Sequence, residues 1–164
     1  MSWESEALDV ERHDLRPFTC GVDDLDQWLK RQAAGAQARR VSRTFVWADD
    51  DALVVAYYAL SAHLFSRNDL PRSVGHGSPS DVPSVLLGRL ALSNALQGQG
   101  LGSALVADAL SRVVQATTQI AARIVVVDAI SEDAAAFYEH LGFVRIPGSM
   151  RFVQKMSSVA AALR

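Results

Sequence analysis

Two different spacings of hydrophobic residues run along the chain, and each predicts a type of secondary structure. Helical spacing predicts a first helix over residues 23–40, with Asp23 as its N-cap. A second helix is expected to begin at the glycine-rich turn 97–102 and to bury Leu105, Val106, Ala109, Leu110 and Val113. A third helix is expected over residues 131–141, before a glycine that suits a helix C-terminus.

Strands are expected where short apolar runs rich in β-formers lie between turn residues. Residues 44–48 and 53–60 would form a hairpin around an acidic turn. Further strands are expected at 85–92, 123–129, 143–146 and 151–155. The stretch 66–83 holds three of the five prolines, so we expect a functional or mobile loop there. The strand–helix–strand unit over 86–129 implies a parallel pair, so the predicted fold is α/β (α+β) with a mixed, twisted sheet flanked by helices.

The composition is typical of one soluble, packed domain covering residues 1–164. Apolar residues make up 49% and charged residues 21%, and the net charge of −2 gives no sign of whole-chain basicity. The single cysteine, Cys20, excludes an intrachain disulfide, and the histidines form no ligand spacing with it, so no metal is expected. No signal peptide is visible, and the apolar stretch 52–65 is too short to span a bilayer. We therefore expect a cytoplasmic protein without membrane contact.

The glycine-rich turn, Gln97-Gly-Gln-Gly-Leu-Gly-Ser103, is the first candidate for chemistry. Glycines between a strand and a helix let the backbone approach a ligand, and the helix start offers unpaired N–H groups to a phosphate. The turn is not a P-loop, because no lysine follows its last glycine, and Ser103 stands where a Rossmann fingerprint needs glycine. The pattern that fits is Q-x-x-G-x-G. A helix entry without a ligand is the alternative interpretation.

Two motifs together resemble the GNAT acetyltransferases. The Q-x-x-G-x-G turn resembles the coenzyme A pyrophosphate loop of that family, and Ala135-Ala-Phe-Tyr-Glu-His-Leu-Gly-Phe143 resembles its late helix. The resemblance implies a GNAT fold, with acetyl-CoA in the cleft between two splayed central parallel strands. It also implies transfer of an acetyl group to an amine.

A narrower resemblance covers nearly the whole chain and indicates the GNAT toxins of type II toxin–antitoxin modules. It is carried by Phe18-Thr-Cys-Gly-Val-Asp-Asp-Leu-Asp-Gln-Trp-Leu29, Arg43-Thr-Phe-Val46, Tyr57-Tyr-Ala-Leu-Ser61, Val85-Leu-Leu-Gly-Arg-Leu-Ala-Leu92 and Asp128-Ala-Ile-Ser-Glu-Asp-Ala-Ala-Ala-Phe-Tyr138. Those toxins acetylate the free α-amine of aminoacyl-tRNA and stop translation. The resemblance therefore implies aminoacyl-tRNA as substrate and a ribbon-helix-helix antitoxin as partner, and we also expect a homodimer.

The resemblance implies a set of residues that contact acetyl-CoA. Backbone groups at Leu90 and Leu92 would meet the pantetheine and the thioester. The turn would hold the pyrophosphate through Gln97, Gly98, Gln99, Gly100, Leu101, Gly102 and Ser103. Ser131 and Asp133 are further expected contacts, and Ser131 stands where many GNAT enzymes carry an asparagine.

Tyr138 aligns with the family's tyrosine near the sulfur. A phenol, with a pKa of about 10, can protonate the leaving thiolate at neutral pH; the alternative is a core aromatic beside Phe137. Strand 85–92 contains no acid and only one charge, Arg89, so the glutamate base of many small-amine GNAT enzymes is missing. An α-amine, with a pKa of about 7.7–8.0, needs less help than a lysine, which favours aminoacyl-tRNA.

The stretch 27–48 contains no acid, and its cations are candidates for contact with a tRNA backbone. The expected tRNA-binding residues are Lys30, Arg31, Arg39, Arg40 and Arg43, with Arg89 nearer the acceptor end. A solvated helix face is the alternative. Two other functions stay open for the whole chain: a GNAT enzyme acting on a small amine or a protein N-terminus, and an acyl-CoA-binding interaction module without catalysis.

Overall fold

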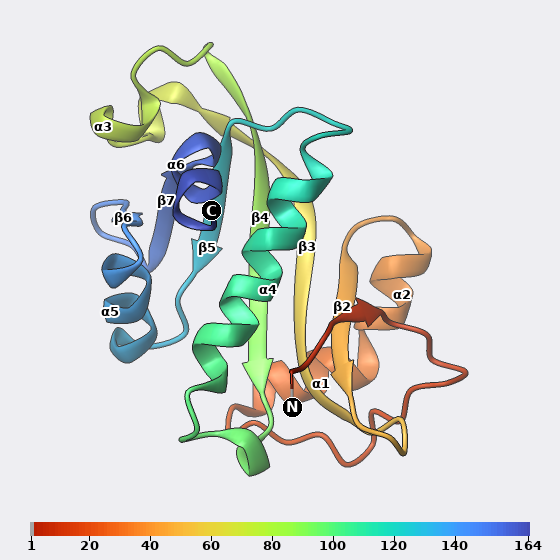
Figure 1. Ribbon diagram of the computed structural model, residues 1–164. Helices are drawn as coiled ribbons and strands as arrows, with labels where there is room; N and C mark the ends of the chain where they lie inside the picture. The colour runs from red at the N-terminus through yellow and green to blue at the C-terminus, as the bar shows by residue number, and fades with distance from the viewer. Residues whose placement is uncertain (1) are drawn as a thin grey trace. The chain divides into compact units, whose positions relative to one another are not determined.

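The computed structural model describes residues 2–164, in which the strands pair in the order β1-β2-β3-β4-β5-β7-β6 (Figure 1). The strands are β1 (Glu6–Ala7), β2 (Arg43–Ala48), β3 (Val54–Ser66), β4 (Asp81–Leu92), β5 (Ile124–Asp128), β6 (Val144–Arg145) and β7 (Arg151–Lys155). The helices are α1 (Asp23–Arg31), α2 (Ala33–Ala38), α3 (Arg72–Gly75), α4 (Leu101–Ala116), α5 (Glu132–His140) and α6 (Met156–Ala162), with short 3-10 turns η1 (Arg67–Asp69) and η2 (Asn94–Leu96). The predicted α/β class with a mixed sheet is confirmed.

The chain divides into two compact units. Unit 1 contains the residues up to Ser61 together with Arg89–Ala109, and unit 2 contains Ala62–Gly88 together with Leu110–Arg164. Strands β3 and β4 and helix α4 each continue from one unit into the other.

The core of unit 1 is built by the first helix and the β2–β3 hairpin. The two strands pair antiparallel, with Val46 opposite Tyr57. Trp28 of α1 stacks on Tyr57 with the ring centroids 6.0 Å apart, and the Tyr57 hydroxyl donates to the Leu25 carbonyl at 2.7 Å. Phe18 meets the same tyrosine ring edge-on. Burial of these large apolar side chains holds α1 against the hairpin.

Unit 2 is organised around β5, which lies between two strands. It pairs in parallel with β4 and antiparallel with β7. Val125 and Val126, on opposite faces of β5, are both fully buried, which explains the continuous apolar run in the sequence. On one face, Val74 of α3 belongs to the same apolar cluster as Val126 and Val153.

Two helices confirm the sequence pattern in detail. The five apolar residues expected to be buried on α4 are all buried. Helix α5 begins after Ser131, whose Oγ accepts a hydrogen bond from the Ala134 N–H at 3.1 Å. Gly142 follows the helix with φ at +94°, a conformation that favours glycine.

The helix expected over 23–40 is wrong in two respects. It breaks at Gln32, whose φ of −120° separates α1 from α2. Asp23 is not the N-cap, because Val22 occupies that position and no side chain caps the helix. Asp23 is the first helical residue, where its negative charge interacts favourably with the positive end of the helix dipole.

The segment 66–83 is more ordered than a loop. It contains η1 and α3, and β4 begins at Asp81. Arg67 donates to the Ser78 carbonyl and Arg123 to the Ser78 hydroxyl, both at 2.8 Å, so hydrogen bonds within unit 2 hold the segment in place. Strand β1 and helix α6 were not expected from the sequence. No helix within residues 2–164 combines the length and the apolar character needed to cross a membrane.

Candidate functional site

The glycine-rich turn leads from β4 through η2 into α4, and glycines shape its backbone. Gly98 and Gly100 have φ values of +80° and +77°, which side chains disfavour. A Cβ atom at Gly98, Gly100 or Gly102 would meet no other atom within 4 Å, so the turn presents bare backbone. The first turn of α4 contains no acid, and its leading N–H groups, those of Leu101 and Ser103 included, have no acceptor within the helix. These residues fit a pyrophosphate group.

Gln97 fastens this turn within unit 1. Its side-chain amide donates to the Cys20 carbonyl at 2.9 Å and to the Leu92 carbonyl at 2.8 Å. The Gln99 amide donates to the Ala95 carbonyl at 3.3 Å. Both glutamines were expected to contact the cofactor, and the structure gives each a role in holding the backbone of the turn.

The end of β4 carries Leu90 and Leu92, both half-buried, and Arg89 just before them. The Arg89 guanidinium carbon lies 4.3 Å from the centre of the Trp28 ring, a cation–π contact. Arg89 forms no ion pair with any acid in residues 2–164. Its charge is therefore positioned by an aromatic ring and remains uncompensated by a carboxylate.

Tyr138 is set into the core of unit 2 by its ring. The residue is 5% exposed, and its ring packs against Phe143 and Phe152, with centroids 5.9 and 6.2 Å away. No residue in the described chain forms a hydrogen bond with its hydroxyl, so this group keeps its donor for a ligand. Burial raises the pKa of Tyr138 to about 12, with a further contribution from the charge of Asp128. The packing confirms the interpretation of Tyr138 as a core aromatic residue, and its role as a general acid stays a prediction.

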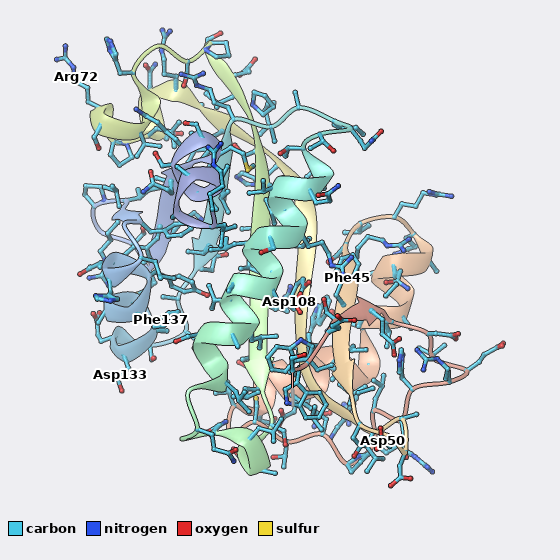
Figure 2. All side chains as sticks on the ribbon, in the orientation of Figure 1. Phe45, Asp50, Arg72, Asp108, Asp133 and Phe137 are labelled. Atoms are coloured by element: carbon cyan, nitrogen blue, oxygen red, sulfur yellow. The ribbon has the colours of Figure 1, made fainter. Side chains whose placement is uncertain are left out.

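Ser131 and Asp133 lie at the start of α5 in unit 2. The Ser131 hydroxyl oxygen is used as the helix cap described above, which leaves its O–H as a donor. Asp133 is exposed in the first turn, at the end of the helix seen in Figure 2. Glu132, beside it, pairs with Arg145 at 3.0 Å.

The sequence reasoning missed an ion pair between the last residue of β5 and the first of β7. Arg151 donates to both oxygens of Asp128, from Nε at 2.7 Å and from a terminal nitrogen at 3.0 Å. The signal that could have found it is an acid at the carboxyl end of a buried parallel strand, a usual place for functional groups.

The five cations between residues 27 and 48 are all exposed. Lys30 and Arg31 close α1, and Arg39, Arg40 and Arg43 lie between α2 and the start of β2. None of the five forms an ion pair within residues 2–164. They leave this part of unit 1 with an uncompensated positive charge.

Cys20 is buried in the core of unit 1 and is not a reactive thiol. Burial raises its pKa to about 11, and the neighbouring Asp26 adds to the shift. Across residues 2–164, no three His, Cys, Asp or Glu side chains gather as metal ligands would.

Comparison with known proteins agrees with the two motifs. The family described as Acetyltransferase (GNAT) domain matches residues 41–145, a range that contains the glycine-rich turn and Tyr138. A "tRNA-acetylating toxin" from Mycobacterium tuberculosis (strain ATCC 25618 / H37Rv) is 37% identical over 150 residues, covering 92% of this chain and 90% of the relative.

Two solved structures of AtaT are similar along their whole length. AtaT complexed with acetyl-methionyl-tRNAfMet has a TM-score of 0.88 and 29% identity, covering 99% of this chain and 100% of that one. A tyrosine-to-phenylalanine mutant of AtaT, bound to the C-terminus of the antitoxin AtaR and to acetyl-CoA, has a TM-score of 0.83 and 27% identity, covering 98% of each chain. Because the family match includes both motifs and the mycobacterial relative covers nearly the whole sequence, this chain belongs to the GNAT acetyltransferase family.

Proposed function

We propose that this protein is the toxin of a type II toxin–antitoxin module, and that it transfers the acetyl group of acetyl-CoA to the α-amine of aminoacyl-tRNA. The observation that carries the proposal is 37% identity over 92% of the chain to a tRNA-acetylating toxin. The fold of AtaT in its complex with acetyl-methionyl-tRNAfMet supports the same substrate class. We also propose that residues 1–164 act as a single domain in the cytoplasm.

Acetyl-CoA supplies an activated acetyl group as a thioester. In our proposal the N–H groups of Gly98, Gly100, Gly102 and Ser103 bind its pyrophosphate, because the turn exposes backbone and leads into the positive end of α4. Backbone groups of β4 near Leu90 and Leu92 orient the pantetheine and the thioester. Ser131 and Asp133 are further contacts.

Tyr138 is the proposed general acid. Its raised pKa keeps the proton on the hydroxyl oxygen at neutral pH, and no residue within 2–164 competes for it. The tyrosine-to-phenylalanine change in the AtaT mutant removes a single hydroxyl, and the analogous test here is Tyr138→Phe.

The substrate amine needs little help from a base. Strand β4 carries Asp81 at its first residue and no acid from Val82 to Leu92. The α-amine of an aminoacyl ester is partly neutral at physiological pH, whereas lysine is almost fully protonated. The exposed cations at Lys30, Arg31, Arg39, Arg40 and Arg43, with Arg89, are the proposed contacts to the tRNA backbone.

The proposed protein partners are an antitoxin and a second copy of the chain. The structure of AtaT with the C-terminus of AtaR supports an antitoxin, and we propose a ribbon-helix-helix protein. A homodimer is proposed as the assembly of the toxin itself. Light scattering of the purified toxin, alone and after co-expression with the product of an adjacent small reading frame, tests both.

The deciding experiment incubates the protein with labelled acetyl-CoA and total charged tRNA. We expect label on aminoacyl-tRNA, none on deacylated tRNA, and little transfer by Tyr138→Phe at unchanged acetyl-CoA affinity. Transfer to polyamines or peptide N-termini with none to charged tRNA would identify a different GNAT enzyme. Binding of acetyl-CoA without turnover on any amine would identify an interaction module.

A further inference from the structure

One face of the sheet in unit 2 changes from apolar to polar along its length. Val126 of β5 lies beside Leu86 of β4 on one side and Val153 of β7 on the other. Because residues two apart along a strand share a face, Asp128 and Arg151 continue the row that Val126 and Val153 begin. The ion pair therefore lies on the same face as this apolar cluster, at the carboxyl end of β5.

Different side chains occupy the two ends of this face. Val74 of α3 packs into the apolar cluster with Phe65 of β3. His63 precedes Phe65 by two residues, and the two ring centroids lie 5.1 Å apart. At the polar end, the Asp128 and Arg151 side chains remain 38% and 31% exposed, so a ligand can reach them.

The ion pair holds its carboxylate in a fixed orientation and leaves it able to accept more hydrogen bonds. Arg151 engages both oxygens of Asp128, and each oxygen keeps a second lone pair. The parallel pairing of β4 with β5 ends at Leu87 and Val127, and the next residue of β4 is Gly88. A Cβ at Gly88 would meet only the Leu86 side chain within 4 Å, so β4 carries little side-chain bulk where its pairing with β5 ends.

Asp128 also lies within electrostatic range of two other groups of unit 2. Besides burial, its charge raises the pKa of Tyr138, the residue that we assign as general acid. Burial lowers the pKa of His63, the charge of Arg151 lowers it further, and Asp128 opposes the shift. Geometry places the two groups at the same end of β5. The Tyr138 ring packs against Phe152, which pairs with Val127, the residue before Asp128, so the ring and the ion pair lie on opposite faces of the sheet at that end.

We propose that the Asp128 carboxylate binds the attacking α-amine of the acceptor and that Arg151 is a positioning residue for it. The inference rests on the proposed function. One N–H of the neutral amine donates to a free lone pair of Asp128, which directs the nitrogen lone pair toward the acetyl carbon. The C–N bond forms and the C–S bond breaks. The nitrogen releases one proton to water, the sulfur takes one from Tyr138, and the Tyr138 phenolate regains a proton from solvent, so the step balances.

Hydrogen bonding at this site selects an amine over other parts of a charged tRNA. The free lone pairs of Asp128 accept a hydrogen bond from an amine N–H, whereas an ionised phosphate has no donor to offer them. Asp128 orients the amine and need not remove its proton, which agrees with a substrate whose amine is partly neutral at physiological pH.

The test compares Asp128→Asn with the wild type in three measurements: steady-state transfer to aminoacyl-tRNA, acetyl-CoA affinity by calorimetry, and thermal unfolding. Asparagine keeps the side-chain shape but loses the charge and one acceptor oxygen. We expect kcat/KM for aminoacyl-tRNA to fall about tenfold or more, the scale of a hydrogen bond to a charged group. Acetyl-CoA affinity should stay within about twofold of the wild-type value, since Asp128 contacts the acceptor.

Two further variants separate amine binding from a purely structural role. Arg151→Lys keeps the positive charge but loses the two-point contact, so we expect a smaller loss of kcat/KM that is also confined to the acceptor. Glu132→Gln is the matched control, because it breaks another Arg–carboxylate pair of unit 2, the one with Arg145 at 3.0 Å, and should leave transfer unchanged.

Each outcome supports or overturns a specific statement. Wild-type kinetics in Asp128→Asn would overturn the inference while leaving the proposed function intact. A parallel loss of acetyl-CoA affinity or of folded protein in both Asp128→Asn and Arg151→Lys would assign the pair a structural role and also overturn it. A wild-type protein that acetylates no α-amine would overturn the proposed function, and the inference with it.

Discussion

The Trp47 indole N–H donates a hydrogen bond to the Asp108 carboxylate at 2.9 Å and thereby joins β2 to α4. Asp108 is labelled on α4 in Figure 2. The same carboxylate accepts from the Tyr58 hydroxyl at 2.7 Å and from the Ser5 backbone N–H at 3.2 Å. Trp3 stacks on Trp47, with the centroids 5.8 Å apart. One acid therefore fastens the N-terminal segment and two strands of unit 1 to the helix that follows the glycine-rich turn.

Replacement of Asp108 by asparagine should destabilise the protein by about 1–3 kcal/mol at pH 7. The half-buried carboxylate accepts hydrogen bonds from several donors, and an asparagine side chain has one acceptor oxygen in place of two. Urea unfolding measures the change. Asp50→Asn, at the exposed tip of the β2–β3 turn, is the control and should leave the free energy of unfolding nearly unaltered. Equal stability of the two variants would mean that the Asp108 contacts add nothing.

The contribution of Asp108 should also depend on pH. Burial opposes its ionisation, but hydrogen bonds from Ser5, Trp47 and Tyr58 outweigh burial and lower its pKa below the usual 3.8. A lowered folded-state pKa stabilises the protein above the unfolded value, and the gain disappears as the pH falls through the folded value. The stability difference between wild type and Asp108→Asn should therefore be constant at neutral pH and shrink below about pH 3.8.

Local patterns were enough to predict the elements whose burial repeats along the sequence. The buried face of α4 and the apolar run of β5 could be predicted directly. In α4 an apolar residue recurs every third or fourth position, because one face of the helix is buried, and in β5 nearly every residue is apolar, because both faces of the strand are buried. The glycine-rich turn was equally visible, since left-handed φ angles select for glycine. These features depend on nearest neighbours in the chain.

Features that depend on tertiary packing could not be predicted. The helix break at Gln32 lies in a stretch without proline, whereas Gly35, a residue type that weakens helices, lies within α2. The Asp108 contacts join residues far apart in the chain. The Asp128–Arg151 pair requires the register between β5 and β7, which no local pattern specifies.

Alanine at Gly102 should separate ligand binding from folding. The position lies in the first turn of α4, its φ is not positive, and a Cβ there meets no atom within 4 Å. The substitution should be neutral or stabilise the protein by up to about 1 kcal/mol. A bound pyrophosphate would meet the new methyl group, so we expect acetyl-CoA affinity measured by calorimetry to fall.

Gly100→Ala is the matched comparison, because its φ of +77° adds backbone strain of about 1 kcal/mol in the same open surroundings. It should lose both stability and affinity, whereas Gly102→Ala should lose affinity alone. Wild-type affinity in both variants would contradict the assignment of this turn to the pyrophosphate.

Removal of single cations should reduce the salt dependence of tRNA binding. Arg39→Gln and Arg43→Gln each delete an exposed charge that has no acidic partner within the described chain. If each contacts a phosphate, the slope of log affinity against log salt should fall by about 1 per substitution. Filter binding at several salt concentrations measures the slope, and Arg164→Gln, at the C-terminus, is the control. An unchanged slope would mean that these residues do not contact tRNA phosphates and would support the alternative of a solvated helix face.

Titration of Tyr138 should reveal how strongly its ring is buried. Among the three tyrosines, Tyr57 and Tyr138 both have pKa values raised by burial, so the difference in phenolate absorbance between wild type and Tyr138→Phe isolates the second. The difference should show a midpoint near 12, whereas a solvated phenol would titrate near 10.

A pKa raised above the unfolded value of 10.0 means that the associated stability is complete below pH 10 and is lost as the pH rises through about 12. Wild type should therefore lose stability relative to Tyr138→Phe over that interval.

The same shift predicts that Tyr138 stays protonated from pH 7 to 10, so a fall in transfer rate within that range would have to come from another group. A difference midpoint near 10 would contradict the burial of the hydroxyl and remove this constraint on the rate.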